Sequence, residues 1–166
     1  MAIGHVRYST TGGGSWENAQ PVWRDDGREV ALAHNGNLTN AVELYNELRE
    51  KGIEFRGTSD SEIMAALLSS NRGRHIEDAV AEVMPRLEGA YSTVAMTKHA
   101  IVAFRDPYGV RPLALGRGRS ICVVSPEITI FDPWPMRVRN IFIWAIVVFW
   151  ASSRMMNDSL SVRPRM

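Results

Sequence analysis

Hydrophobic residues recur at helical spacing in the segment 38–52. One face of a helix would carry the apolar residues at positions 38, 41, 42, 45 and 48. Asn37 or Thr39 can cap the start of this helix, and Gly52 stands where a helix terminator belongs. The spacing therefore predicts an amphipathic helix that ends at Gly52.

Two further helices are predicted after it. Ser59 and Glu62 have the spacing of a capping box, directly before the apolar residues Ile63, Met64, Leu67 and Leu68. A third helix is expected over roughly 75–84, because its apolar residues share one side, namely Ile76, Ala79, Val80 and Val83.

Strands are predicted on both sides of these helices. The candidate segments are 1–8, 28–36, 90–97, 100–106, 112–116 and 120–125, with a short strand at the start of 53–70. Asn35-Gly36 favours positive backbone dihedrals and predicts a sharp turn at the end of 28–36. Strands at both ends of the chain around paired helices predict an α+β fold, with helices packed on antiparallel sheet.

The pattern changes after about residue 127. Residues 131–166 carry five arginines and two aspartates, a net charge of +3, whereas the first 130 residues carry −2. We expect residues 1–127 to form one domain and 128–166 to be an unrelated tail, either read from a shifted frame or disordered. Its longest apolar run, 141–151, is too short to span a bilayer, which takes about 20 residues.

Composition and charge exclude several classes of protein. The chain of 166 residues is 45% hydrophobic and has a net charge of +1, so nothing in the total suggests nucleic acid or a membrane surface. The one cysteine, Cys122, allows no internal disulfide and fits a reducing, cytoplasmic compartment. Cys122 lies in an apolar strand, where a buried inert thiol is expected. The four histidines show no metal-ligand spacing.

Three polar stretches could carry chemistry, and each also has a structural interpretation. Arg7 in "GHVRYST" could hold a carboxylate in bidentate fashion, or be a surface arginine on an edge strand. Asn35 and Gly36 in "HNG" offer a side-chain amide and a backbone N–H for an oxyanion, although Asn-Gly pairs mostly form turns. Asp60 in "TSDSE" could bind an ammonium group, or cap a helix.

In combination these stretches are more specific. The blocks "GHVRYSTTG", "ENAQP", "LAHNGNLTN", "TSDSE", "LEGAYS" and "RDPYGVRPLALGR" occur in this order. From residue 3 to about 127 the sequence resembles the class II glutaminase domain of the amidophosphoribosyltransferase family. Glucosamine-6-phosphate synthase, another class II amidotransferase, shares the "HNG" block, but "SDSE" followed by "RDPYGVRPL" fits the purine-synthesis family better.

The resemblance implies a fold, a reaction and roles for the residues. The fold would be the αββα sandwich of N-terminal nucleophile hydrolases, here without its first strands. The family transfers the amide nitrogen of glutamine to phosphoribosyl pyrophosphate, which gives 5-phosphoribosylamine in purine biosynthesis. Arg7 would bind the glutamine carboxylate and Asp60 its ammonium group, while Asn35 and the Gly36 N–H would form the oxyanion hole. "RDPYGVRPL" is similar to a loop and strand that brace the domain.

The resemblance also implies what this chain lacks. The family nucleophile is a cysteine at the mature N-terminus, and this sequence has no cysteine before Cys122. We therefore expect the chain to be inactive alone, as part of a larger enzyme, or to be a glutamine-binding module without a nucleophile. The whole enzyme would be a homo-oligomer that uses magnesium in its transferase domain and, in some members, an iron–sulfur cluster. No cofactor is expected in this segment.

Overall fold

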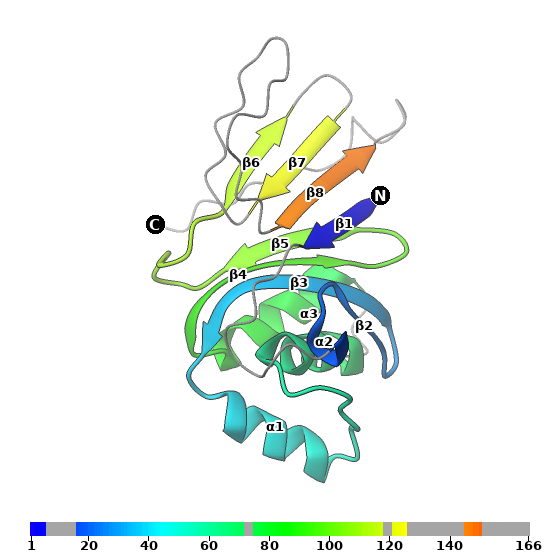
Figure 1. The fold of residues 1–166 in the computed structure, drawn as a ribbon, viewed down its shortest axis with the longest axis vertical. Helices are drawn as coiled ribbons and strands as arrows, with labels where there is room; N and C mark the ends of the chain where they lie inside the picture. Colours follow the sequence, from blue (N-terminus) through cyan, green and yellow to red (C-terminus); the bar gives the residue numbers. More distant parts are fainter. Residues whose placement is uncertain (6–15, 72–74, 118–120, 126–144, 151–166) are drawn as a thin grey trace.

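The structure is a computed structural model that describes residues 1–5, 16–71, 75–117, 121–125 and 145–150. Two four-stranded antiparallel sheets form its framework (Figure 1). The first sheet has the strand order β2 (Val22–Asp25), β3 (Glu29–Leu38), β4 (Gly89–Met96), β5 (Ile101–Arg105). The second has the order β1 (Ala2–His5), β8 (Ala145–Trp150), β7 (Ile121–Ser125), β6 (Ala114–Arg117).

Three helices cover the face of the first sheet that is turned away from the second sheet (Figure 1). They are α1 (Ala41–Glu50), α2 (Asp60–Ser70) and α3 (Ile76–Val83), with short 3-10 turns at Trp16–Asn18 and Met84–Arg86. The described part of the chain therefore forms three layers, in the order helices, first sheet and second sheet. The predicted α+β class with helices on antiparallel sheet is confirmed.

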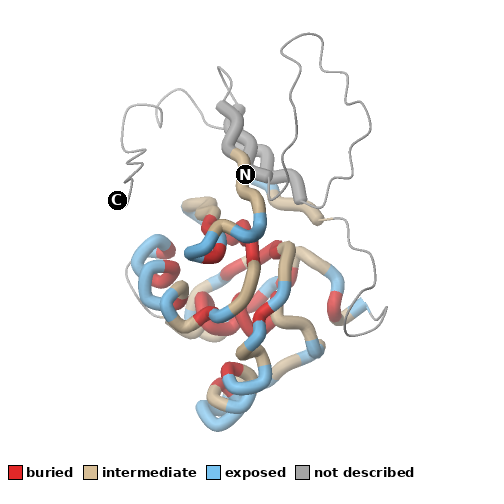
Figure 2. Tube along the Cα trace, turned by 90° about the vertical axis from the view of Figure 1, so that its left-hand side faces the viewer, coloured by how far each residue is buried: buried red, intermediate tan, exposed pale blue. Residues whose placement is uncertain are grey.

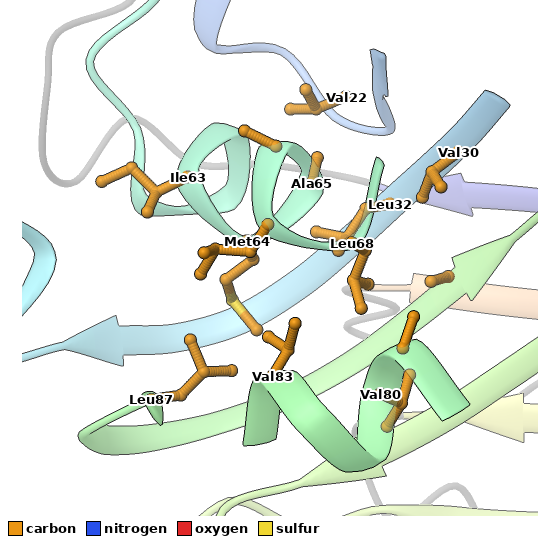
Figure 3. Packing of buried hydrophobic residues seen from close by; sticks show 14 of the residues in the cluster. Val22, Val30, Leu32, Ile63, Met64, Ala65, Leu68, Val80, Val83 and Leu87 are labelled. Carbon is orange, nitrogen blue, oxygen red and sulfur yellow. The ribbon is translucent and has the colours of Figure 1, made fainter. Parts of the chain in front are cut away.

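The main core lies between the helices and the first sheet (Figures 2 and 3). Helix α2 is its centre, because it contacts β2 and β3 on one side and α1 and α3 on others. Nearly all residues of α2 are buried, which explains why its sequence is apolar on more than one face. A smaller cluster around Val94 joins the two sheets and includes Ile3, Ile101, Ala103 and Leu113.

The predicted turn at Asn35-Gly36 is wrong, because β3 continues through both residues to Leu38. Gly36 is paired with Tyr91 of β4 and has a φ of +134°. A Cβ atom at Gly36 would lie 2.0 Å from the Ala90 carbonyl oxygen. The glycine is therefore needed where two strand backbones approach closely, which is a role that glycine also has inside strands.

The first helix and most of its predicted face are confirmed, because Leu48 is buried and Ala41 and Tyr45 pack against the core, but its cap differs. Helix α1 begins at Ala41, with Asn40 in the cap position. It buries Leu44 and Leu48, whereas Val42 on the predicted face is 70% exposed. Gly52 follows the helix with a φ of +82°, as expected of a terminator.

The short strand predicted at the start of 53–70 does not form, nor does the capping box after it. Ser59 is the N-cap of α2 but makes no side-chain hydrogen bond there. Glu62 instead accepts hydrogen bonds from the backbone N–H groups of Arg56 and Gly57. These N–H groups are satisfied by a side chain, so the segment has no need of a partner strand.

The remaining elements were predicted close to their observed positions, with two exceptions. Helix α3 and the strands β3 to β7 lie within a few residues of the predicted segments, and β1 occupies the start of 1–8. Strand β2 was not predicted. Strand β8 lies in the expected tail and pairs with β1 and β7. The relation of the whole segment 128–166 to the domain stays a prediction.

Candidate functional site

The site is built around the end of β3, where successive side chains point to opposite faces of the sheet. His34 points to the helix side and meets Ser61 of α2, with 3.0 Å between its Nδ1 and the Ser61 Oγ. Asn35 points to the side of the second sheet and meets His5 of β1. Two neighbouring polar residues thus serve different layers of the fold.

The carboxamide of Asn35 is held from the second sheet. Its Oδ1 lies 3.0 Å from Nε2 of His5, across the interface between the sheets. An amide oxygen only accepts hydrogen bonds, so the His5 Nε2 must donate. With Oδ1 engaged, the Asn35 Nδ2 group is the part of this amide that can donate to a ligand oxygen.

The Gly36 N–H points to the edge of β3 that faces away from β4. The N–H of His34 donates to the Gln20 Oε1 at 2.6 Å, and the N–H of Leu38 donates to the Asp60 Oδ2 at 3.1 Å. Backbone N–H groups two residues apart leave an antiparallel strand on the same edge, so the Gly36 N–H lies between these two. Strand β2 pairs with β3 only from Glu29 to Leu32 and does not reach this point.

Asp60, the first residue of α2, brings a carboxylate to the same edge. Its Oδ2 accepts from the Leu38 N–H, and its Oδ1 lies 3.7 Å from Nδ1 of His34. The side chain remains 17% exposed. A negative charge is therefore fixed beside the end of β3 and can still be reached by a positively charged ligand group.

Burial keeps the neighbouring His34 in its neutral form. Removal from water lowers the pKa of His34 below its ordinary value, and the charges of His5 and Arg111 act in the same direction. The nearby Asp60 carboxylate opposes this effect without overcoming it. A neutral His34 leaves the charge of Asp60 uncompensated at neutral pH.

The lowered pKa predicts that the free energy of unfolding falls as the pH drops through about 6.5, the ordinary value for histidine. In that range the unfolded chain takes up a proton at residue 34 and the folded chain does not, so unfolding is favoured. One such group contributes a slope of at most about 1.4 kcal/mol per pH unit. Urea unfolding at several pH values between 7.5 and 5 measures this dependence. The free energy of unfolding should change less steeply with pH in His34→Asn than in the unmodified chain. An equal pH dependence in the two proteins would contradict a lowered pKa of His34. His99→Asn, at an exposed position, is the control.

A buried arginine supports the loop that leads to Asp60. The guanidinium of Arg24 is bidentate to Asp26, at 2.6 and 2.8 Å, and donates to the Glu62 Oε1 at 2.9 Å. It also donates to the Glu54 carbonyl and lies 5.2 Å from the ring centroid of Phe55. The hydrogen bond with Asp26 raises the pKa of Arg24, although burial opposes it. This arginine therefore joins β2, the loop and α2.

The loop "RDPYGVRPL" is braced internally at its start. The Asp106 side chain is buried and accepts hydrogen bonds from the backbone N–H groups of Val110, Arg111 and Tyr91. Burial alone would raise the pKa of this carboxyl, but these N–H groups hold it below its ordinary value. The carboxylate thus fixes the turn after β5 against β4.

The structure brings together three of the four predicted site residues. Asn35, Gly36 and Asp60 lie at the end of β3, while Arg7 lies outside the described residues. Sequence analysis missed His5, which contacts Asn35, and also His34 and Gln20, which are hydrogen-bonded to each other beside the site. The alternation of His34 and Asn35 along a strand was the signal for His34, and the expected turn hid it.

The described part of the chain contains neither a metal-binding cluster nor a membrane-spanning helix. Within it, no three His, Cys, Asp or Glu side chains are grouped so that they could hold a metal ion. Among the described helices none has the length and apolar character needed to cross a membrane.

Comparison with known proteins identifies related domains. A family model described as a glutamine amidotransferase domain matches residues 5–133. Amidophosphoribosyltransferase of Mycobacterium leprae is 46% identical over 135 residues, which cover 76% of this chain and 24% of that protein. The Bacillus subtilis amidophosphoribosyltransferase is 40% identical over 133 residues, which cover 79% of this chain and 28% of that protein.

Solved structures agree with these matches. Glutamine phosphoribosylpyrophosphate amidotransferase from B. subtilis, complexed with ADP and GMP, has a TM-score of 0.64 and 35% sequence identity. The similarity covers 72% of this chain and 26% of that one. A structure described as the allosteric regulatory enzyme of purine biosynthesis has a TM-score of 0.61 and 33% identity, over 87% of this chain. The chain spans about a quarter of the length of these relatives.

Proposed function

The chain belongs to the class II glutamine amidotransferase family, with a domain similar to that of amidophosphoribosyltransferase, and on that premise we propose that it binds glutamine at the end of β3. The observation that carries the proposal is the position of the Asp60 carboxylate and the Gly36 N–H on one edge of β3, next to the Asn35 amide. These groups complement the ammonium group and the amide carbonyl of glutamine.

Each part of the ligand has a counterpart of suitable chemistry. The exposed part of the Asp60 carboxylate would accept from the ligand ammonium in a charge-assisted hydrogen bond. The Gly36 N–H and the Asn35 Nδ2 would donate to the amide carbonyl. Arg7 would hold the ligand carboxylate through its guanidinium. When a nucleophile attacks the carbonyl, the same two donors would stabilise the oxyanion that develops.

The attacking group would come from outside the residues that form this site. The one cysteine of the sequence, Cys122, lies in β7, and β8 separates β7 from β1. We infer that the chain alone binds glutamine without hydrolysing it at a useful rate, because binding groups without a nucleophile leave only weak residual catalysis.

For the whole protein we propose the reaction of the amidophosphoribosyltransferase family. Ammonia released from glutamine would attack the anomeric carbon of phosphoribosyl pyrophosphate and displace pyrophosphate, which would give 5-phosphoribosylamine. The layers that the structure describes would then be part of an αββα sandwich of the N-terminal nucleophile hydrolase type. Magnesium and, in some members, an iron–sulfur cluster would be bound by other parts of a homo-oligomeric enzyme.

Asp60→Asn is expected to weaken the binding of L-glutamine to the chain by about tenfold or more, because a charge-assisted hydrogen bond contributes roughly 1.5–3 kcal/mol. Isothermal titration calorimetry measures this change. Asp78→Asn, at an exposed position of α3, is the matched control and should bind as the unmodified chain does.

A second ligand separates the role of Asp60 from a general loss of structure. 4-Carbamoylbutanoate is glutamine without its ammonium group, and Asp60→Asn should bind it as well as the unmodified chain does. The proposal fails if the unmodified chain, shown to be folded, gives no saturable heat with millimolar L-glutamine. The assignment of Asp60 fails if the variant loses affinity for both ligands equally.

A further inference from the structure

We propose that His5 is a positioning residue, which holds the carboxamide of Asn35 in the one orientation that presents its Nδ2 group to the carbonyl oxygen of the ligand. The inference rests on the proposed glutamine site and adds to it a residue with no contact to the ligand. It starts from a hydrogen bond that joins the two sheets, between Nε2 of His5 and Oδ1 of Asn35 at 3.0 Å.

The two ends of a carboxamide have opposite hydrogen-bonding character. Oδ1 only accepts and Nδ2 only donates, so an oxyanion site needs Nδ2 toward the ligand and Oδ1 away from it. A rotation of 180° about the last side-chain bond would place Oδ1 against the ligand oxygen and remove a donor. With its proton on Nε2, His5 selects the useful orientation, because the rotated amide would turn its NH2 group toward the Nε2–H of His5.

The surroundings of Asn35 in its own sheet do not impose this orientation. Ser92 is paired with Asn35 in the β3–β4 register, and directly opposite residues point to the same face. The Ser92 side chain is fully buried and its Oγ has no hydrogen-bond partner among the described residues. The described restraint on the Asn35 amide therefore comes from His5 alone.

The location of His5 suits this task. It is the last residue of β1 and pairs with Ala145 of β8, so its backbone is held by the second sheet. Because Asn35 belongs to the first sheet, the hydrogen bond also ties the site to the packing of one sheet on the other. Separation of the sheets at this point would release the amide.

Two variants distinguish positioning from a general structural role. His5→Leu removes the donor, whereas the side-chain amide of His5→Gln can still donate to Oδ1. We expect His5→Leu to weaken L-glutamine binding by about fivefold to tenfold, as for one lost hydrogen bond, and His5→Gln to restore most of the affinity. L-Norvaline has the ammonium and carboxylate groups of glutamine but no carboxamide, so its affinity should be the same in all three proteins.

Equal loss of affinity for L-glutamine and L-norvaline in His5→Leu would overturn the proposal, and so would unchanged affinity for both. Failure of the unmodified chain to bind either ligand would instead overturn the proposed function. His99→Leu, at an exposed position, is the control.

A measurement on the unmodified chain needs neither a ligand nor a folded variant. Long-range ¹H–¹⁵N spectra show which ring nitrogen of a neutral histidine carries the proton. We expect the proton of His5 on Nε2, with the Asn35 side-chain NH2 signals sharp and shifted from random-coil values. A neutral His5 protonated at Nδ1 alone would overturn the proposal, because Nε2 could then not donate to Asn35.

Discussion

Gly36→Ala is expected to destabilise the domain by more than about 3 kcal/mol, a large part of the roughly 5–15 kcal/mol that holds a typical domain together. The added Cβ would lie 2.0 Å from the Ala90 carbonyl oxygen and 2.7 Å from the Tyr91 Cα. Both are backbone atoms of β4, so relief requires β3 and β4 to separate. The φ of +134° at Gly36 adds strain for any residue with a side chain.

Gly52→Ala is the control for the conformational part of this effect. Gly52 also has a positive φ, +82°, but an added Cβ would meet nothing within 4 Å. We expect a loss of about 1 kcal/mol there, which is the ordinary cost of a left-handed conformation. Urea unfolding of both variants, followed by circular dichroism, measures the difference. Equal losses would show that the close approach of β4 to Gly36 is not a feature of the folded chain.

Glu62→Ala is expected to cost about 3–5 kcal/mol, because it leaves a buried positive charge with one partner fewer. Glu62 is almost fully buried in α2 and accepts from the guanidinium of Arg24 at 2.9 Å. It also accepts from the N–H groups of Arg56 and Gly57, at 2.9 and 2.7 Å. Truncation leaves all three donors without their carboxylate, in a region from which water is excluded.

Glu47→Ala is the matched control, since Glu47 is also a glutamate in ion pairs, here with Lys51 and Arg86. Its side chain is 39% exposed, so this surface network should contribute no more than about 1 kcal/mol. Thermal unfolding followed by calorimetry compares the two variants. If Glu62→Ala costs no more than Glu47→Ala, the buried network does not support the loop before Asp60.

The helices and most strands could be predicted because their patterns are local. In α3 the apolar residues at helical spacing are the residues that it buries. In α1 the same reasoning chose a face that includes Val42, which is exposed in the structure. The direction of the core at this helix is set by α2, which the spacing within α1 does not reveal. Spacing identifies an amphipathic helix, and the tertiary contacts decide which neighbouring face is buried.

The misassigned segments depend on distant residues. Asn35-Gly36 is a turn signal by composition, and the approach of β4, more than 50 residues later in the sequence, makes it part of a strand. Glu62 has the spacing of a capping residue but binds Arg24, nearly 40 residues earlier in the sequence. In both cases a tertiary contact replaces the interaction that local sequence favours.

The candidate site was found in part from the sequence. Asn35, Gly36 and Asp60 were identified by the chemistry of their groups and by resemblance, and the structure places them together at the end of β3. Gln20, His5 and His34 act through other residues, so they leave no chemical signature in the sequence. The contacts of His5 and His34 depend on the packing of β1 and α2 against β3, and the contact of Gln20 depends on the segment that leads into β2.

The most direct test of a glutamine site at the end of β3 is a titration of the ¹⁵N-labelled chain with L-glutamine, followed by ¹H–¹⁵N correlation spectra. We predict saturable shifts of the Gly36 backbone N–H and of the Asn35 side-chain NH2 signals, with a common dissociation constant. Signals of Glu77 and Asp78, which are exposed at the start of α3, should not move. Saturable binding that leaves the Gly36 and Asn35 signals unchanged, or no shifts at millimolar L-glutamine, would contradict this site.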